Sequence, residues 1–318
     1  MQKWLILIIL FLIILFILLY NIVNHTEDKV LFYPSTKRIW KPKIPYETIY
    51  LNTNNEEVCY SSSEKIKDND YISCWHFNNY KNKPHILFFH GNSGNVTNRS
   101  YIINLCDKFK LNLFLFDYSG FGTSTNKPHK LFLRENAETV YNYLHRKINI
   151  PRKDIVIWSE SLGCVSASYL ASKYECGGLI MLCGFSSLDD VLKYTYKGYK
   201  RTAVEFLASM LSYKMDLLPV KDYLSYTKCP VVIIHSKKDN LIPYECSRIN
   251  YNRIFSQKKL HITIDGNHSG PKITSKQLTQ TFDFLDIPHD LSSDKIDDML
   301  KSLETFAKRN NNFMNYTL

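Results

Sequence analysis

The change of pattern that decides the fold lies in the stretch Asp154-Ile-Val-Ile-Trp158-Ser159-Glu160-Ser161-Leu162-Gly163. Four apolar residues give way abruptly to Ser-x-Ser-x-Gly, and small and apolar residues follow. This pattern predicts a short buried strand that passes into a helix with almost no loop between the two. A serine on so sharp a turn has an exposed hydroxyl, and Ser161 is therefore the candidate nucleophile.

The residues around Ser161 fit the same interpretation. The usual motif is Gly-x-Ser-x-Gly, because a large side chain two residues from the serine would separate the strand from the helix. Ser159 stands in place of the first glycine and is the next smallest polar residue. The backbone N–H of Leu162 would lie at a helix N-terminus, where developing negative charge is stabilised. Leu162 is therefore a candidate oxyanion donor.

Short apolar runs on either side of this turn predict a parallel sheet, because both faces of such strands must be covered. The predicted strands are residues 85–90, 111–117, 154–158, 178–183, 230–235 and 260–264, preceded by two antiparallel edge strands at 46–51 and 71–77. The predicted helices between them are residues 98–109, 131–148, 162–174, 242–256 and 275–286. This alternation predicts a mostly parallel, doubly wound α/β sheet. A long insertion, about 185–229, is expected to form a helical cap.

The ends of the chain predict a membrane anchor and a tail. Residues 4–23 form a nearly unbroken apolar run, about the length that a bilayer requires, and no small-residue cleavage site follows. We therefore expect a transmembrane anchor over 1–23, a juxtamembrane linker over 24–44 and a catalytic domain over 45–290. Residues 291–318 are expected to form a helix and a disordered tail.

Net charge and cysteine content limit the kinds of binding partner and metal site that the sequence supports. The net charge of +10 suits an acidic partner, but no zinc-finger spacing or RNA-binding motif occurs, so the sequence favours a membrane over nucleic acid. Positive charges after the apolar run favour a single-pass protein whose catalytic domain is cytoplasmic rather than lumenal. The eight cysteines include no Cys-x-x-Cys pair and fall mostly in apolar stretches, which predicts buried thiols and no metal.

Ligands of open α/β sheets bind beyond the carboxyl ends of the strands, so the residues that follow each strand are of interest. Gly91 and Asn92 follow one strand in a Gly-rich turn, where a second oxyanion donor is expected. Asp239 follows a later strand, and His268 follows the last. Asp265 competes as the acid, but it is too close to the histidine in sequence to reach its far nitrogen.

The order Ser161, Asp239, His268, with each residue after a different strand, is the order of a nucleophile, an acid and a base in one class of serine hydrolase. His90, His235 and His261 are weaker candidates for the base, because the first two end strands and the third lies within one. The sequence therefore predicts a catalytic triad at the carboxyl edge of the sheet.

At this point the chain resembles the α/β-hydrolase superfamily, and in particular its membrane-anchored esterases, monoacylglycerol lipases and protein depalmitoylases. The motifs that carry the resemblance are His90-Gly-Asn-Ser-Gly-Asn95, Asp117-Tyr-Ser-Gly-Phe-Gly-Thr-Ser124, Ser159-x-Ser161-x-Gly163, Asp239 with Ile242-Pro243, and Gly266-Asn-His268. The resemblance extends from about residue 45 to 286. The chain departs from the pattern at Ser159 and at Ser269-Gly270.

The resemblance implies a membrane-anchored serine hydrolase that cleaves carboxylic esters or thioesters of a lipid or lipidated substrate, with no cofactor. Two alternatives remain open at this stage. A serine peptidase would share the triad, and a non-catalytic binding protein would share the fold.

Overall fold

The computed structural model describes residues 31–52, 70–196 and 218–289, together with residues 202, 296–298, 300 and 301. Within these ranges, no helix combines the length and the hydropathy that crossing a bilayer requires. The predicted anchor over 1–23 lies outside the described residues, as do Cys59, residues 197–201 and 203–217 of the predicted cap insertion, and the C-terminal tail.

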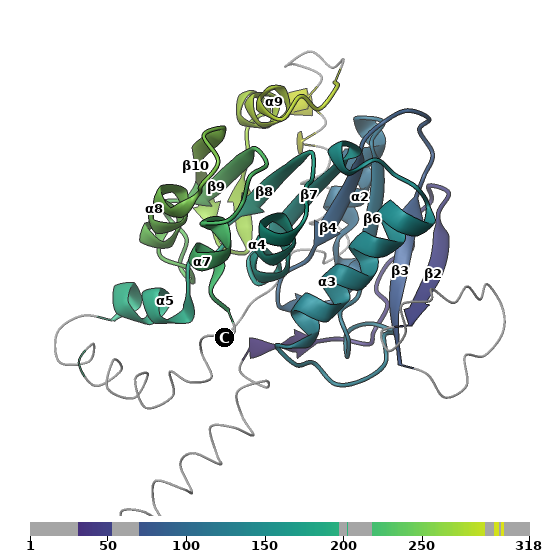
Figure 1. Cartoon of the computed structure of the whole chain (residues 1–318), viewed down its shortest axis with the longest axis horizontal. Helices are drawn as coiled ribbons and strands as arrows, with labels where there is room; N and C mark the ends of the chain where they lie inside the picture. Colours follow the sequence, from purple (N-terminus) through teal and green to yellow (C-terminus); the bar gives the residue numbers. More distant parts are fainter. Residues whose placement is uncertain are drawn as a thin grey trace, which may run out of the picture.

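A nine-stranded sheet forms the centre of the protein (Figure 1). Its strands lie in the spatial order β11-β10-β9-β8-β7-β4-β6-β3-β2. Their bounds are β2 Glu47–Asn52, β3 Tyr71–Phe77, β4 His85–Phe89, β6 Asn112–Phe116, β7 Ile155–Glu160, β8 Gly178–Leu182, β9 Val231–Ser236, β10 Lys259–Asn267 and β11 Gly270–Lys272. The expected parallel sheet is confirmed.

Strand direction follows the hydrophobic pattern. The six strands β4, β6, β7, β8, β9 and β10 are parallel, whereas β2, β3 and β11 are antiparallel to their neighbours. Every residue of β4, β6, β7, β8 and β9 is buried, as strands covered on both faces must be. β2 is exposed at its start, which is typical of an edge strand.

Helices cover the two faces of the sheet (Figure 1). The bounds are α2 Ser100–Lys108, α3 Phe132–Asn142, α4 Gly163–Lys173, α5 Leu188–Thr195, α7 Val220–Leu224, α8 Tyr244–Arg253 and α9 Ser275–Phe284, with a π-helical turn over Tyr143–Lys147 and 3-10 turns over Val96–Asn98 and Arg152–Asp154. One hydrophobic core joins α3, α4, α7 and α8 to the sheet, and the other joins α2 and α9 to its opposite face. The layers are those of a doubly wound sheet.

The described part of the predicted linker, residues 31–44, packs against the domain. A short strand, β1 (Tyr33–Pro34), pairs in parallel with β5 (Ser93–Gly94), which lies in the loop after β4. Phe32 is only 4% exposed and belongs to the core beneath α3 and α4. These residues therefore belong to the folded unit, because β1 pairs with the loop after β4 and Phe32 is buried in the core.

The predicted cap insertion contributes two described helices. α5 and α7 lie within it, and each contacts α8 or α4. α5 begins at Ser187, whose side chain accepts a hydrogen bond from the Asp190 N–H. The seven described cysteines are free and buried, as the sequence predicts.

Candidate active site

Ser161 occupies the turn between β7 and α4. Its φ angle is 50°, in the left-handed region that non-glycine residues rarely adopt. The Ser161 N–H donates to the Leu182 carbonyl over 2.9 Å, which fixes the turn against the end of β8. Backbone strain of this kind persists only where the surrounding structure holds it, and it is concentrated at functional sites.

The two small residues on either side of Ser161, at positions 159 and 163, are small for different reasons. A Cβ atom added to Gly163 would lie 2.3 Å from the Phe89 carbonyl oxygen, so this position requires glycine. Ser159 is fully buried, and its hydroxyl donates to the Ile180 carbonyl over 3.0 Å. A serine fits in place of the usual glycine because its hydroxyl has an acceptor on the neighbouring strand.

Three predicted residues come together at the carboxyl edge of the sheet. Ser161 Oγ lies 3.0 Å from His268 Nε2, and His268 Nδ1 lies 2.8 Å from Asp239 Oδ2. The His268 and Asp239 side chains are almost completely buried, at 5% and 0% exposure. An ionised carboxylate can only accept, so Nδ1 carries the proton and Nε2 is left to accept from the serine.

Asp239 is held as a carboxylate by its surroundings. Burial would raise the pKa of this carboxyl, but hydrogen bonds from His235 and His268 outweigh it and hold the pKa well below its usual range. The backbone N–H groups of Leu241 and Ile242 donate to its other oxygen, over 2.9 and 2.8 Å. A fixed negative charge therefore faces the imidazole, where it would stabilise the imidazolium.

The other candidates lie elsewhere. Asp265 has an exposed side chain that pairs with Lys238 over 2.8 Å. His235 Nε2 lies 3.4 Å from the Asp239 Oδ2 atom that His268 also contacts, and 3.1 Å from the Ile242 carbonyl oxygen. His261 faces the Ser247 hydroxyl over 3.1 Å. Among the described residues, no hydrogen bond joins any of these three to Ser161, and His268 alone among the candidate bases bonds to it.

The predicted oxyanion residues separate into two kinds. The Gly91 N–H donates to the Glu160 carboxylate over 3.0 Å, so it is already occupied. The N–H groups of Asn92 and Leu162 have no hydrogen-bond partner among the described residues. Of the predicted donors, Asn92 and Leu162 are therefore available to a ligand, and Gly91 is not.

The direction of the Asn92 N–H follows from the peptide that it shares with Gly91. His90 Nδ1 lies 2.7 Å from the Gly91 carbonyl oxygen, and a carbonyl can only accept, so His90 donates. Burial lowers the pKa of His90 well below its usual value, which keeps the ring neutral. A trans peptide points its N–H opposite to its C=O. The histidine on one side thus turns the Asn92 N–H to the other.

A buried ion pair supports this loop and was not predicted from the sequence. Arg99 Nε lies 2.8 Å from Glu160 Oε1, and the two side chains are 0% and 8% exposed. The Tyr101 hydroxyl donates to the other Glu160 oxygen. The one sequence signal was an acidic residue between two serines at the end of an apolar strand, where a carboxylate needs a partner.

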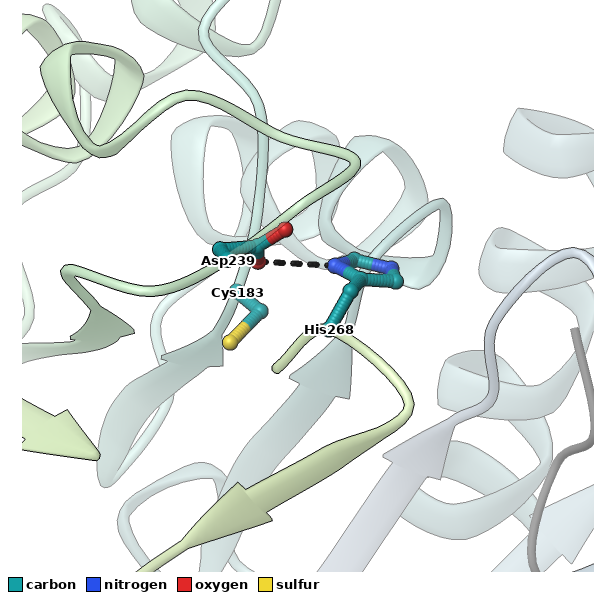
Figure 2. Close-up of side chains that lie close together, drawn as sticks. All are labelled: Cys183, Asp239 and His268. Atoms are coloured by element: carbon teal, nitrogen blue, oxygen red, sulfur yellow. Dashed lines mark hydrogen bonds and ion pairs between the residues drawn. The ribbon is translucent and has the colours of Figure 1, made fainter. Parts of the chain in front are cut away.

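Figure 2 shows Cys183 beside Asp239 and His268. Ligand atoms of these three residues lie within 4.8 Å of one another, close enough to surround a metal ion. Burial, followed by the charge of Asp239, raises the pKa of the Cys183 thiol well above its usual value, which favours the protonated form. The 2.8 Å bond between Asp239 and His268 also occupies both of their ligand atoms. The chemistry fits an orienting hydrogen bond better than a metal site.

Fold and site together are those of an α/β hydrolase, and the chain belongs to that family. A family model described as "Alpha/beta hydrolase of unknown function (DUF1057)" matches residues 71–228. An uncharacterized protein of Acanthamoeba polyphaga mimivirus is 30% identical over 233 residues, which cover 67% of this chain and 76% of that protein.

Animal relatives match a shorter part. "Alpha/beta hydrolase domain-containing protein 17C" of Xenopus tropicalis is 30% identical over 169 residues, or 53% of this chain and 50% of the relative. The human protein of the same name is 28% identical over 169 residues, or 53% of this chain and 47% of the relative. The chain thus spans about half the length of these curated relatives.

Solved structures show the same fold. The Pyrococcus furiosus esterase Pf2001 aligns with a TM-score of 0.56 and 18% identity, over 87% of this chain and 98% of the esterase. An acetyl xylan esterase from Paenibacillus sp. R4 aligns with a TM-score of 0.56 and 12% identity, over 77% of this chain and 89% of that enzyme.

Proposed function

We propose that this protein is a membrane-anchored serine hydrolase that cleaves carboxylic ester or thioester bonds of a lipid or lipidated substrate. The observation that carries the proposal is the continuous hydrogen-bonded chain from Ser161 through His268 to Asp239, with the serine on a strained turn. Strained turns and titratable groups with perturbed pKa values reduce stability, and in proteins they are concentrated at functional sites.

In the proposed mechanism, Ser161 Oγ attacks the carbonyl carbon as His268 Nε2 takes its proton. The tetrahedral intermediate collapses when the imidazolium protonates the leaving alcohol or thiol, and the acyl group remains on the serine. Water, deprotonated by the same imidazole, then attacks the acyl-enzyme, and the imidazolium returns that proton to Ser161 Oγ as the acid is released. Asp239 keeps the ring in the required tautomer and stabilises its protonated form.

The oxyanion would be held by the backbone N–H groups of Leu162 and Asn92. Leu162 directly follows the nucleophile at the N-terminus of α4, where the helix dipole adds to the stabilisation. Each donor of this kind contributes about 3–4 kcal/mol to transition-state binding. No metal ion or organic cofactor takes part in this mechanism.

The substrate class follows from where the chain would place the site. The apolar run over 4–23 is proposed to span the membrane, and the chain enters the described domain at Leu31, whose carbonyl accepts from the Asn92 side chain over 3.3 Å. At about 3.3–3.6 Å per residue, the eight residues from Val23 to Leu31 span at most roughly 29 Å. The active site is therefore held near the bilayer, where acylated substrates are found.

The side of the membrane is also part of the proposal. Lys37, Arg38, Lys41 and Lys43 follow the apolar run, whereas Lys3 alone precedes it. This asymmetry supports a cytoplasmic catalytic domain. Protease treatment of sealed membrane vesicles with known orientation tests this topology: cytoplasmic placement predicts digestion of the domain from the cytoplasmic side alone.

Covalent labelling is the direct test of the hydrolase. The full chain, in detergent or nanodiscs, is treated with a fluorophosphonate probe and assayed on nitrophenyl esters and thioesters of graded chain length, beside an amide substrate. We expect probe attachment to Ser161, hydrolysis of esters and thioesters, and loss of both signals in Ser161→Ala.

The matched control is Ser159→Ala, because this second serine of the motif is buried and bonded to Ile180. It should retain labelling. Labelling that persists in Ser161→Ala, or its absence from the folded wild-type protein, would refute the proposed chemistry. Turnover of the amide alone would instead indicate a peptidase.

A further inference from the structure

The loop that carries Asn92 is bound along its length by the segment that would leave the membrane. We call residues 31–38 the N-terminal strap. Its β1 strand pairs in parallel with β5, with Tyr33 opposite Ser93. The Tyr33 N–H donates to the Asn92 carbonyl over 2.8 Å, and the Ser35 N–H donates to the Gly94 carbonyl over 3.1 Å.

A buried side-chain amide at the end of the loop also donates both of its N–H groups to carbonyls of the strap. Asn95 is 1% exposed, and its side-chain N–H groups donate to the Ser35 carbonyl over 2.8 Å and to the Lys37 carbonyl over 2.9 Å. Its side-chain oxygen accepts from the Thr97 N–H and so caps the following turn. The same residue therefore joins the strap to the loop and ends the loop.

The strap is itself fixed to the domain. Phe32 packs in the core, and its ring lies 6.2 Å from that of Phe121 in an edge-to-face arrangement. The Ser35 carbonyl also accepts from the Gly122 N–H over 3.2 Å. Arg38 Nη2 donates to the Thr123 hydroxyl over 3.2 Å. The strap thus connects the loop after β4 to the loop after β6.

These bonds bear on the proposed oxyanion donor. The two peptides around Asn92 are held on both sides: His90 holds the carbonyl that precedes its N–H, and Tyr33 of the strap holds the carbonyl that follows. Both φ and ψ of Asn92 are thereby restrained. Backbone donors contribute to catalysis only when they are fixed before the charge develops.

We infer that the N-terminal strap is a positioning element of the active site, which fixes the Asn92 backbone donor through its bonds to residues 92–95. This inference rests on the proposed hydrolase activity and deepens it. Full activity would therefore require the chain from Leu31 onward rather than from residue 45. A displacement of the membrane-proximal segment would also move the oxyanion loop, because the two are hydrogen-bonded.

Point substitutions in the full chain test the inference. Ser35→Pro removes the N–H that donates to Gly94, since proline has no backbone donor. Asn95→Asp keeps the oxygen that caps Thr97 but places a carboxylate against two strap carbonyls. The matched control is Asn79→Asp, which places a carboxylate against a backbone carbonyl, that of Pro45, at an exposed position outside the strap and the loop.

Turnover is measured per active site, with the sites titrated by the fluorophosphonate probe. We expect Ser35→Pro and Asn95→Asp to lower kcat about 10- to 100-fold, with KM within about twofold, because part of one oxyanion donor's contribution is lost. The pH dependence of kcat should be unchanged, because the bonds between Ser161, His268 and Asp239 do not involve the strap. Asn79→Asp should match the wild type.

Amide hydrogen exchange of residues 91–95 is a second measurement, which does not depend on activity. We expect faster exchange in Ser35→Pro and Asn95→Asp than in the wild type. The inference would be overturned if both variants kept the wild-type kcat per titrated site. This holds even if fewer sites could be titrated, because a smaller number of fully active sites indicates a purely structural role. Failure of the proposed hydrolase would show differently, as no labelling or turnover in the wild-type protein.

Discussion

The Glu160 carboxylate, directly before the nucleophile in sequence, accepts a hydrogen bond from the Gly91 N–H over 3.0 Å. This contact links the strand that presents Ser161 to the loop that presents Asn92. Arg99, fully buried, neutralises the same carboxylate over 2.8 Å. One charged side chain thus adds a direct link between the strand of the nucleophile and the oxyanion loop, beside the pairing of β4 with β7.

Glu160→Ala should therefore destabilise the protein strongly. Removal of one partner from a buried ion pair leaves the other charge without compensation, at about 3–5 kcal/mol. Urea unfolding measures the loss. The control is Asp286→Asn, in the exposed pair with Lys258, where the change should stay within about 1 kcal/mol. Asparagine also tolerates the positive φ of 56° at this position. Equal losses in the two variants would contradict the assignment of a structural role to Glu160.

Asp239→Asn should reduce kcat about 10²- to 10⁴-fold with little loss of fold, because the amide neither stabilises the imidazolium nor enforces the tautomer. The control is Asp265→Asn, which removes the competing acid from an exposed pair with Lys238. Ester hydrolysis by both variants is the measurement. A larger loss of activity in Asp265→Asn than in Asp239→Asn would refute the assignment of the acid.

Substitutions at the two small positions of the serine motif should both lower stability but differ in their effect on probe labelling. In Gly163→Ala the new methyl would lie 2.3 Å from the Phe89 carbonyl, so α4 must shift. We expect a loss of about 1–3 kcal/mol or more in stability, and a loss of probe labelling as Ser161 moves. Ser159→Gly should retain labelling and lose about 1–2 kcal/mol, from one hydrogen bond and backbone entropy. Thermal unfolding and probe labelling measure both, and normal labelling of Gly163→Ala would refute the steric argument.

Asp117 should make stability fall as the pH rises. Burial raises the pKa of its carboxyl to about 7, against hydrogen bonds from Val96 and Thr123 and the charge of Arg99. The folded protein therefore binds a proton that the unfolded chain, with a carboxyl pKa near 3.8, has released. Its contribution is fully present below the unfolded pKa and is lost as the pH rises through about 7.

Asp117→Asn isolates this effect, because other titrating groups are common to both proteins. From pH 5 to pH 8, the unfolding free energy of the wild type should fall by about 2–3 kcal/mol relative to that of the variant. Denaturant unfolding at the two pH values measures the difference. A difference of zero, or one of opposite sign, would show that Asp117 is ionised in the folded protein.

The sequence predicted the fold well because its signals are local. Apolar runs such as that before Ser159 identify strands wherever they occur, and strand–helix alternation leaves few possible topologies. Ser161, Asp239 and His268 were found for the same reason, since parallel strands bring their following loops to one edge. The structure places all three within hydrogen-bonding distance in series.

Contacts between distant segments could not be predicted in this way. Gly91 was chosen as an oxyanion donor from its position in a turn, yet its N–H is bound by Glu160. Nothing near Gly91 in the sequence indicates that bond. Likewise, residues 31–38 read as a basic linker with a proline, and their pairing with Ser93 and Gly94 depends on a neighbour some sixty residues away.

The sequence by itself determined the sheet, the order of nucleophile, acid and base, and the need for glycine at position 163. These depend on hydrophobic periodicity and turn chemistry, which are properties of short segments. Only the tertiary structure decided which backbone N–H groups remain available beside Ser161, and that the N-terminal strap holds the loop bearing one of them. Hydrogen-bond partners are assigned by proximity in space, and a buried donor or acceptor bonds to whatever group the fold brings nearest.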